Sequence, residues 1–165
     1  MDGVKICEGI SDISDSYSGI LIDQWGTLHD GEKPYDGVIE ALENLKSRGK
    51  QIILISNSGQ RAEDNTKRLV KIGFRADLFN HVVTSAEVTW RSLENREEGV
   101  FKGLGNKCFL MNRANDVSVL NDTDIVVVDD VNDADFVLLT GSEAPTKTLE
   151  NYYDDILRNA KEYYV

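Results

Sequence analysis

A carboxylate and a hydroxyl each follow a short apolar run in the first third of the 165-residue chain. Asp23 follows the run at 19–22, and Ser56 follows the run at 52–55. A carboxylate at the end of a buried strand can attack a phosphoryl group, hold Mg²⁺ or cap the next turn. Capping is the commonest role of an isolated Asp, so the residues around Asp23 must decide between the three.

Segments with helical spacing of apolar residues separate the apolar runs. Asp36 is placed to cap the first of these helices, and Gly49 is placed to end it. Strands that alternate with helices form right-handed βαβ units and a parallel sheet, whose chemistry lies at the carboxyl ends of the strands. Asp23 and Ser56 both occupy such ends. The other expected elements are a helix at 61–72, a strand at 81–83 and a helix that follows a capping box of Thr84 and Glu87.

The pattern changes after the glycine-rich stretch at 99–105. Strands are expected at 107–111, 125–128 and 136–139, and a helix at 146–161. The acidic stretch at 129–135 lacks the residue order of a calcium-binding EF-hand, so it is interpreted as a solvated turn.

The composition limits the classes of partner. Eighteen basic and 29 acidic residues give a formal net charge of −11, which opposes binding to nucleic acids and anionic membranes. No apolar run approaches the roughly 20 residues of a membrane span, and the N-terminus lacks the pattern of a signal peptide. Cys7 and Cys108 match no metal-binding spacing and are expected to be reduced thiols. These features favour a cytoplasmic protein.

Two motifs carry a resemblance to a known family. LIDQWGTLHDG, at 21–31, resembles the first motif of the haloacid dehalogenase superfamily, DxDGT after an apolar strand. The segment ISNS at 55–58 resembles its second motif, and FVLLTG at 136–141 is similar to a cap-domain strand of its class IIA branch, which includes NagD-like and 4-nitrophenylphosphatase-like proteins. Trp25, followed by Gly26 and later by HDG, resembles one bacterial subgroup of this branch.

The resemblance implies an α/β fold. We expect residues 1–90 to form the N-terminal part of a Rossmann-like parallel core that contains both motifs. Residues 91–165 are expected to form part of an α/β cap domain.

The resemblance also assigns roles to individual residues. Asp23 would be both the nucleophile and a Mg²⁺ ligand, and the backbone carbonyl of Trp25 a second ligand. Ser56, helped by backbone N–H groups near Asn57, would bind the phosphoryl oxygens, and Gly26 would permit the tight turn. The implied activity is Mg²⁺-dependent hydrolysis of small phosphorylated metabolites through an aspartyl-phosphate. A bound Mg²⁺ would also offset the acidity of the chain locally.

Two departures from the family pattern leave enzyme activity open. The family's second Asp, its general acid and base, is Trp25 here, and indole has no titratable proton near neutral pH. No candidate for the family's later Lys and acidic motif follows residue 141 in a suitable strand and loop. We therefore expect a truncated, N-terminal portion with weak or no turnover. The alternative is a non-catalytic phosphate- or metabolite-binding protein on the same fold.

Further expectations concern a strand edge and three side chains. The superfamily places its first strand centrally, so strand 19–22 would become an exposed apolar edge here and favour self-association. His29 could contact substrate or pack locally, and both remain open. His81 is expected to be structural, and Trp90 is expected in a core or a domain interface.

Overall fold

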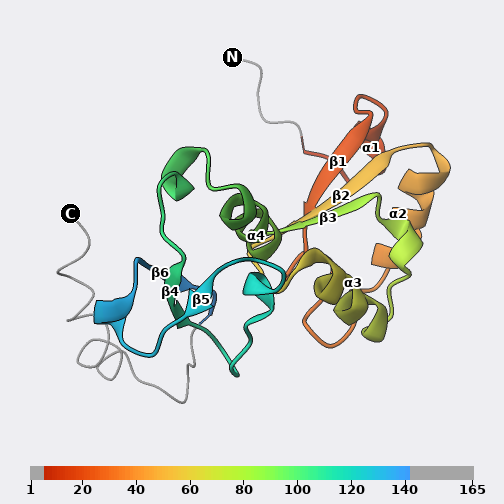
Figure 1. Ribbon diagram of the computed structural model, residues 1–165. Coiled ribbons are helices and arrows are strands. Elements are labelled where there is room, and N and C mark those ends of the chain that lie inside the picture. The colour runs from red at the N-terminus through yellow and green to blue at the C-terminus, as the bar shows by residue number, and fades with distance from the viewer. Residues whose placement is uncertain (1–5, 142–165) are drawn as a thin grey trace. The chain divides into compact units, whose positions relative to one another are not determined.

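The computed structural model describes residues 6–141, which form two units of strands and helices (Figure 1). The first unit runs to Ser58 and resumes over Ala62–Ser85. The second unit consists of Gly59–Arg61 and the chain from Ala86 onward. Both units contain parallel strands, so the predicted α/β class is confirmed.

The first unit contains a parallel sheet of three strands in the order β1-β2-β3. The register places Asp23 opposite Ile55 and Ser56 opposite Thr84. The polar ends of β1 and β2 therefore lie beside each other, as expected for parallel strands. The bounds are β1 Gly19–Asp23, β2 Gln51–Ser56 and β3 His81–Thr84.

Three α-helices and a 3₁₀ turn accompany this sheet: α1 Ser11–Ser14, α2 Val38–Ser47, α3 Ala62–Lys71 and η1 Ala76–Leu78. The predicted cap of α2 by Asp36 is wrong. Gly37 occupies the capping position in the left-handed conformation, with φ of 79°, and no side chain caps the helix. The Tyr35 carbonyl accepts the hydrogen bond from the Val38 N–H at 3.2 Å. A backbone carbonyl therefore accepts the hydrogen bond from an N–H group at the start of the helix, in place of the Asp36 carboxylate.

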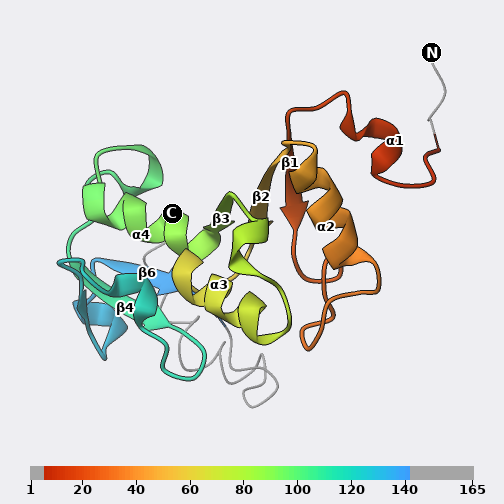
Figure 2. The same ribbon diagram turned by 90° about the vertical axis from the view of Figure 1, so that its right-hand side faces the viewer.

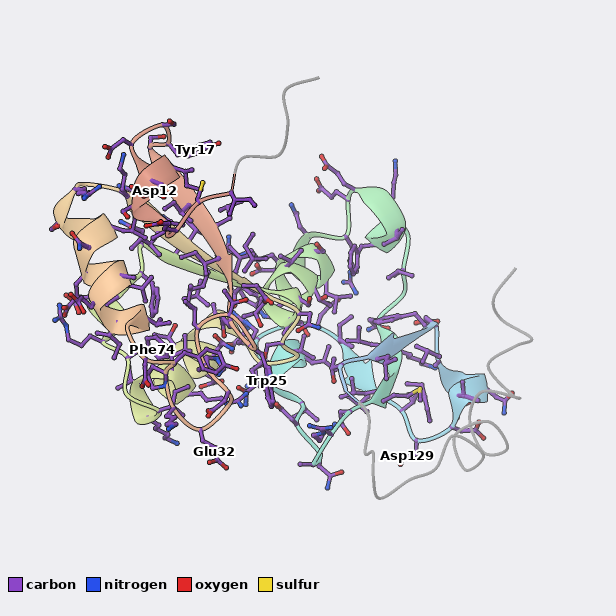
Figure 3. All side chains as sticks on the ribbon, turned by 180° about the vertical axis from the view of Figure 1, so that it is seen from behind. Asp12, Tyr17, Trp25, Glu32, Phe74 and Asp129 are labelled. Carbon is purple, nitrogen blue, oxygen red and sulfur yellow. The ribbon has the colours of Figure 1, made fainter. Side chains whose placement is uncertain are left out.

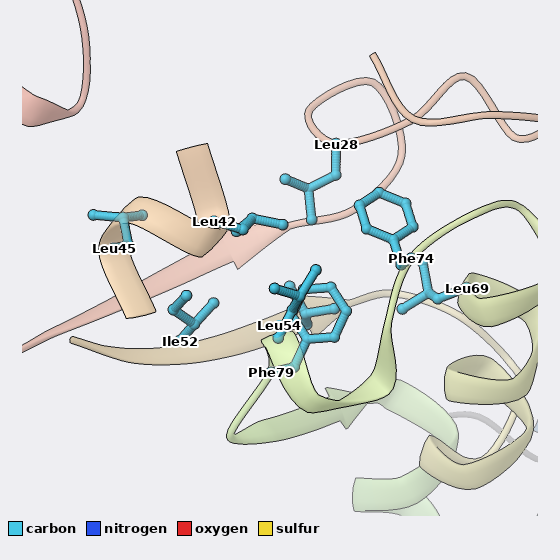
Figure 4. Close-up of a cluster of buried hydrophobic side chains, with 9 residues drawn as sticks. Leu28, Leu42, Leu45, Ile52, Leu54, Leu69, Phe74 and Phe79 are labelled. Carbon is cyan, nitrogen blue, oxygen red and sulfur yellow. The ribbon is translucent and has the colours of Figure 1, made fainter. Parts of the chain in front are cut away.

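The core of the first unit is built around β2. Ile52 and Leu54 are fully buried and alternate with more exposed residues along the strand. Figure 4 shows their side chains among those of α2, α3 and the loops that follow β1 and α3. The other buried members of this cluster are Leu28, Leu42, Leu45, Leu69, Phe74, Leu78 and Phe79.

The second unit contains another three-stranded parallel sheet, in the order β5-β4-β6. Strands β4 Lys107–Met111 and β6 Phe136–Leu139 match the predicted ranges, and β5 Val126–Val127 is shorter than predicted. Figure 2 shows α4, Ser85–Asn95, near β4 and β6. The buried core of this unit consists of Ala86, Leu93, Cys108, Val119 and Leu120. The helix expected at 146–161 lies outside the described residues.

Short 3₁₀ turns connect the strands of the second unit: η2 Gly99–Phe101, η3 Ser118–Leu120 and η4 Val131–Asp133. The acidic stretch at 129–135 contains η4. The Asp130 carboxylate accepts a hydrogen bond from the Asn132 N–H at 2.9 Å and so caps this turn. Over residues 6–141, no group of three or more His, Cys, Asp or Glu side chains could hold a metal ion. No helix in the same range is long and apolar enough to cross a membrane.

Candidate functional site

Asp23 and Ser56 end neighbouring parallel strands. Asp23 is exposed, and Ser56 is half-buried. Asp23 pairs with Ile55 in the register of the sheet, and Ser56 is the next residue along β2. The Ser56 hydroxyl accepts a hydrogen bond from the Ser58 N–H at 3.2 Å. This contact links the hydroxyl to the start of the following loop, where Asn57 is exposed. The carboxylate and hydroxyl singled out in the sequence therefore lie at the same edge of the sheet.

The chain turns sharply after Asp23. Gly26 has φ of 79°, a left-handed conformation that strains other residues, and its N–H donates to the His29 carbonyl at 2.9 Å. The Leu28 N–H donates to the Gln24 carbonyl at 2.8 Å. Trp25 lies in this turn with 65% of its surface exposed (Figure 3). A bulky aromatic side chain thus lies two residues beyond the carboxylate and remains open to solvent.

Two neighbours border the Trp25 ring. A Cβ added to Gly31 would lie 3.2 Å from the ring edge, so only a glycine fits there without displacing the ring. The guanidinium carbon of Arg68, on α3, lies 5.8 Å from the ring centroid, within cation–π range. Arg68 forms no ion pair with any residue in the described part of the chain.

His29 is buried, and its contacts are local. Its Nδ1 accepts a hydrogen bond from the Gly31 N–H at 3.0 Å, and its ring contacts those of Phe74 and Trp25 at centroid distances of 6.2 and 6.3 Å. Burial, followed by the charge of Arg68, lowers the pKa of His29, and the charges of Asp30 and Asp23 oppose that shift. Of the two roles left open for His29, the contacts favour local packing.

The turn beyond His29 is stabilised by Asp30. Its carboxylate accepts hydrogen bonds from the Glu32 and Lys33 N–H groups, both at 2.9 Å. These backbone donors, Lys33 first, lower the pKa of Asp30. Asp30 therefore orders the loop that contacts Trp25.

Gln24 is the buried neighbour of Asp23. Its side-chain Nε2 has no acceptor among the described residues. A buried donor without a partner costs stability.

The oxygen atoms at this edge of the sheet fit a divalent cation that takes only a few of its ligands from the protein. Asp23 offers an exposed carboxylate, and no described backbone donor bonds to the carbonyl of Trp25. Mg²⁺ characteristically takes one or two protein carboxylates and completes its shell with water and phosphate oxygens. The two donors match that chemistry, although no larger acidic cluster occurs within residues 6–141.

Sequence reasoning missed Arg68. Arg68 occupies an exposed position of α3, as basic residues of surface helices commonly do, and no sequence motif distinguishes it as a functional residue. His81 is exposed on β3. Trp90, expected in a core or an interface, is half-buried in the second unit, where its Nε1 donates to the Asn121 carbonyl at 2.7 Å and the Arg61 guanidinium lies 3.7 Å above its ring.

Residues 20–126, which include both motifs, match the family of haloacid dehalogenase-like hydrolases. The chain belongs to this family. Among curated relatives, sugar-phosphatase AraL of Bacillus subtilis (strain 168) is 37% identical over 75 residues, covering 45% of this chain and 27% of the relative. Human chronophin is 31% identical over 91 residues, covering 54% of this chain and 31% of the relative.

Solved structures extend the likeness of this haloacid dehalogenase-like chain to nearly its full length. A hydrolase of the same family from Brucella suis 1330 superimposes with a TM-score of 0.83 at 25% identity, covering 96% of this chain and 55% of that one. The 4-nitrophenylphosphatase of Thermotoga maritima shares the fold, with a TM-score of 0.61 at 22% identity, covering 90% of this chain and 53% of that one. The chain therefore has the class IIA fold and spans about half the length of these proteins.

Proposed function

We propose that this haloacid dehalogenase-like chain carries the nucleophile and phosphate-binding edge of a Mg²⁺-dependent phosphatase for small phosphorylated metabolites. The observation that carries the proposal is the placement of Asp23 and Ser56 at the ends of adjacent parallel strands. A phosphatase name among the curated relatives supports the reaction class. Two free thiols, Cys7 and Cys108, support a reducing cytoplasmic setting.

Asp23 would act as the nucleophile. One carboxylate oxygen attacks phosphorus, the bond from phosphorus to the leaving oxygen breaks, and an aspartyl-phosphate forms. Water then attacks the phosphorus of this intermediate, which releases inorganic phosphate and restores the carboxylate. The Ser56 hydroxyl and backbone N–H groups near Asn57 would hold the phosphoryl oxygens. Mg²⁺, held by Asp23 and the Trp25 carbonyl, would supply positive charge for the phosphate.

Trp25 would limit the rate of both steps. Its indole cannot donate a proton to the leaving oxygen or remove one from the attacking water. Both protons must then be exchanged with solvent, and the loss of a positioned acid–base group typically slows a reaction by about 10²- to 10⁴-fold. We therefore expect slow turnover that favours substrates with good leaving groups.

A phosphate-release assay on the 165-residue chain tests this proposal. Release should require Mg²⁺ and should be lost in Asp23→Asn, which keeps the size of the side chain and removes its nucleophilic charge. Asp36→Asn is a matched control, because Asp36 is exposed and caps no helix. Equal release by Asp23→Asn and Asp36→Asn would rule out Asp23 as the nucleophile.

Trp25 also favours a second candidate function, phosphate or metabolite binding without catalysis. Calorimetry with phenyl phosphate, with and without Mg²⁺, distinguishes the two when it is paired with the release assay. Saturable binding without any release of phosphate would favour the binding function.

A further inference from the structure

Trp25 and Arg68 together form an exposed, cationic aromatic surface next to Asp23. The ring is 65% exposed although the Gly31 backbone and the Arg68 side chain both border it. An exposed Trp is unusual for a residue with so large an apolar surface, and exposed aromatic rings commonly serve as binding surfaces. This surface therefore requires an explanation other than packing.

The charge of Arg68 is available for a ligand. In the described residues it has no carboxylate partner, whereas Arg75, another exposed arginine of the same unit, pairs with Glu43 and Asp77. The Arg68 guanidinium carbon lies 5.8 Å from the centroid of the Trp25 ring, and Trp25 follows Asp23 by two residues in the turn after β1. In a chain of net charge −11, a cation that has no carboxylate partner within residues 6–141 and borders the Trp25 ring is suited to an anion.

We propose that Arg68 and Trp25 form a substrate subsite for a phosphate ester whose leaving group contains a ring with a flat face. Arg68 binds phosphate oxygens, for which the guanidinium has the required charge and planar donors. The Trp25 ring stacks against the flat face of the leaving group, either an aromatic ring or the C–H face of a cyclic sugar. This inference rests on the proposed function, because it takes the phosphate to be bound at Asp23.

The subsite predicts a preference among three phosphate esters of different shape. Calorimetry in Mg²⁺ buffer on the 165-residue chain should show tighter binding of phenyl phosphate and of glucose 6-phosphate than of glycerol 3-phosphate, which has no ring. The comparison of the first two identifies whether the subsite is suited to an aromatic or a sugar ring. Equal affinity for all three esters would overturn the stacking role of Trp25.

Substitutions separate the two residues. Arg68→Gln should weaken the binding of every ester by about tenfold or more, since a hydrogen-bonded charge is lost. Lys71→Gln removes the same charge from an exposed position of the same helix and should change the affinity little. Trp25→Ala should abolish the ring preference. Arg68→Lys keeps the charge and should retain part of the affinity, which a purely structural role of Arg68 would not explain.

Failure of this subsite is distinguishable from failure of the proposed catalysis. Ring-selective, Arg68-dependent binding without phosphate release would retain the subsite and overturn catalysis. Phosphate release that depends on Asp23 but is equal in Arg68→Gln and Lys71→Gln would overturn the subsite alone. Absence of saturable binding by any ester, in a chain whose circular dichroism shows it folded, would also overturn the subsite.

Discussion

Trp25 combines a large exposed ring with the absence of an acid–base group at the candidate site. Its ring contributes area and a cation–π contact with Arg68 but no titratable proton. In the proposed site, this residue would weaken acid–base catalysis and strengthen binding. This opposition between rate and affinity can be measured by substitution.

Trp25→Asp should raise the rate of phosphate release and weaken the binding of ring-containing esters. A carboxyl group at this position can exchange a proton with the leaving oxygen, which we expect to raise kcat on the order of 10²-fold or more. The stacking surface is lost, so KM for phenyl phosphate should rise. Trp25→Asn is the control, because it matches Asp in size without its proton chemistry. Equal kcat values for the two variants would contradict an acid–base role at this position.

At the scale of elements, β2 positions the site. It lies between β1 and β3, buries Ile52 and Leu54 completely, and ends at Ser56. Its central place fixes the register of both neighbours, and the register places Asp23 beside the end of β2. The stability of this strand and the geometry of the site are therefore linked.

Leu54→Ala should destabilise the first unit by about 2–5 kcal/mol, because a large side chain leaves a cavity in a close-packed core. Ile55→Ala is the neighbouring control on the same strand, and it should cost less because Ile55 is 43% exposed. Urea denaturation followed by circular dichroism measures both free energies of unfolding. Similar losses would show that the burial pattern of β2 does not determine its contribution to stability.

At the scale of the whole molecule, each unit has its own hydrophobic cluster. Cys108 is fully buried in the second cluster, and burial raises the pKa of its thiol to about 11. At pH 8 this thiol is protonated and shielded, and only the thiolate reacts with alkylating agents. Cys108 therefore reports the opening of the second unit.

At pH 8, iodoacetamide should alkylate Cys7 in the native chain well before Cys108, as measured by mass spectrometry of digested samples. Leu93→Ala, in the same cluster as Cys108, should accelerate the labelling of Cys108. Leu54→Ala, in the other cluster, should not. Equal acceleration by the two substitutions would show that the two units open as one cooperative block.

Several elements could be predicted from local patterns. Strands β1, β2, β4 and β6 follow short apolar runs bounded by polar or glycine residues, and the structure contains them close to their predicted bounds. The start of α2 could not be predicted in the same way. Asp36 is a good capping residue, but Gly37 takes a left-handed conformation and the Tyr35 carbonyl satisfies the Val38 N–H. Caps depend on the path of the backbone, which residue preferences constrain weakly.

The sequence by itself determined that Asp23 and Ser56 end parallel strands, because alternating apolar runs and helices specify both the strand ends and their common direction. It left the role of His29 open and gave no sign of Arg68. Only the tertiary structure shows what surrounds these two side chains. Burial against Phe74 orders His29, and the packing of α3 through the buried Leu69 turns the adjacent Arg68 toward Trp25. The face that a helix turns toward a distant loop depends on long-range packing, so it cannot be predicted from a local sequence pattern.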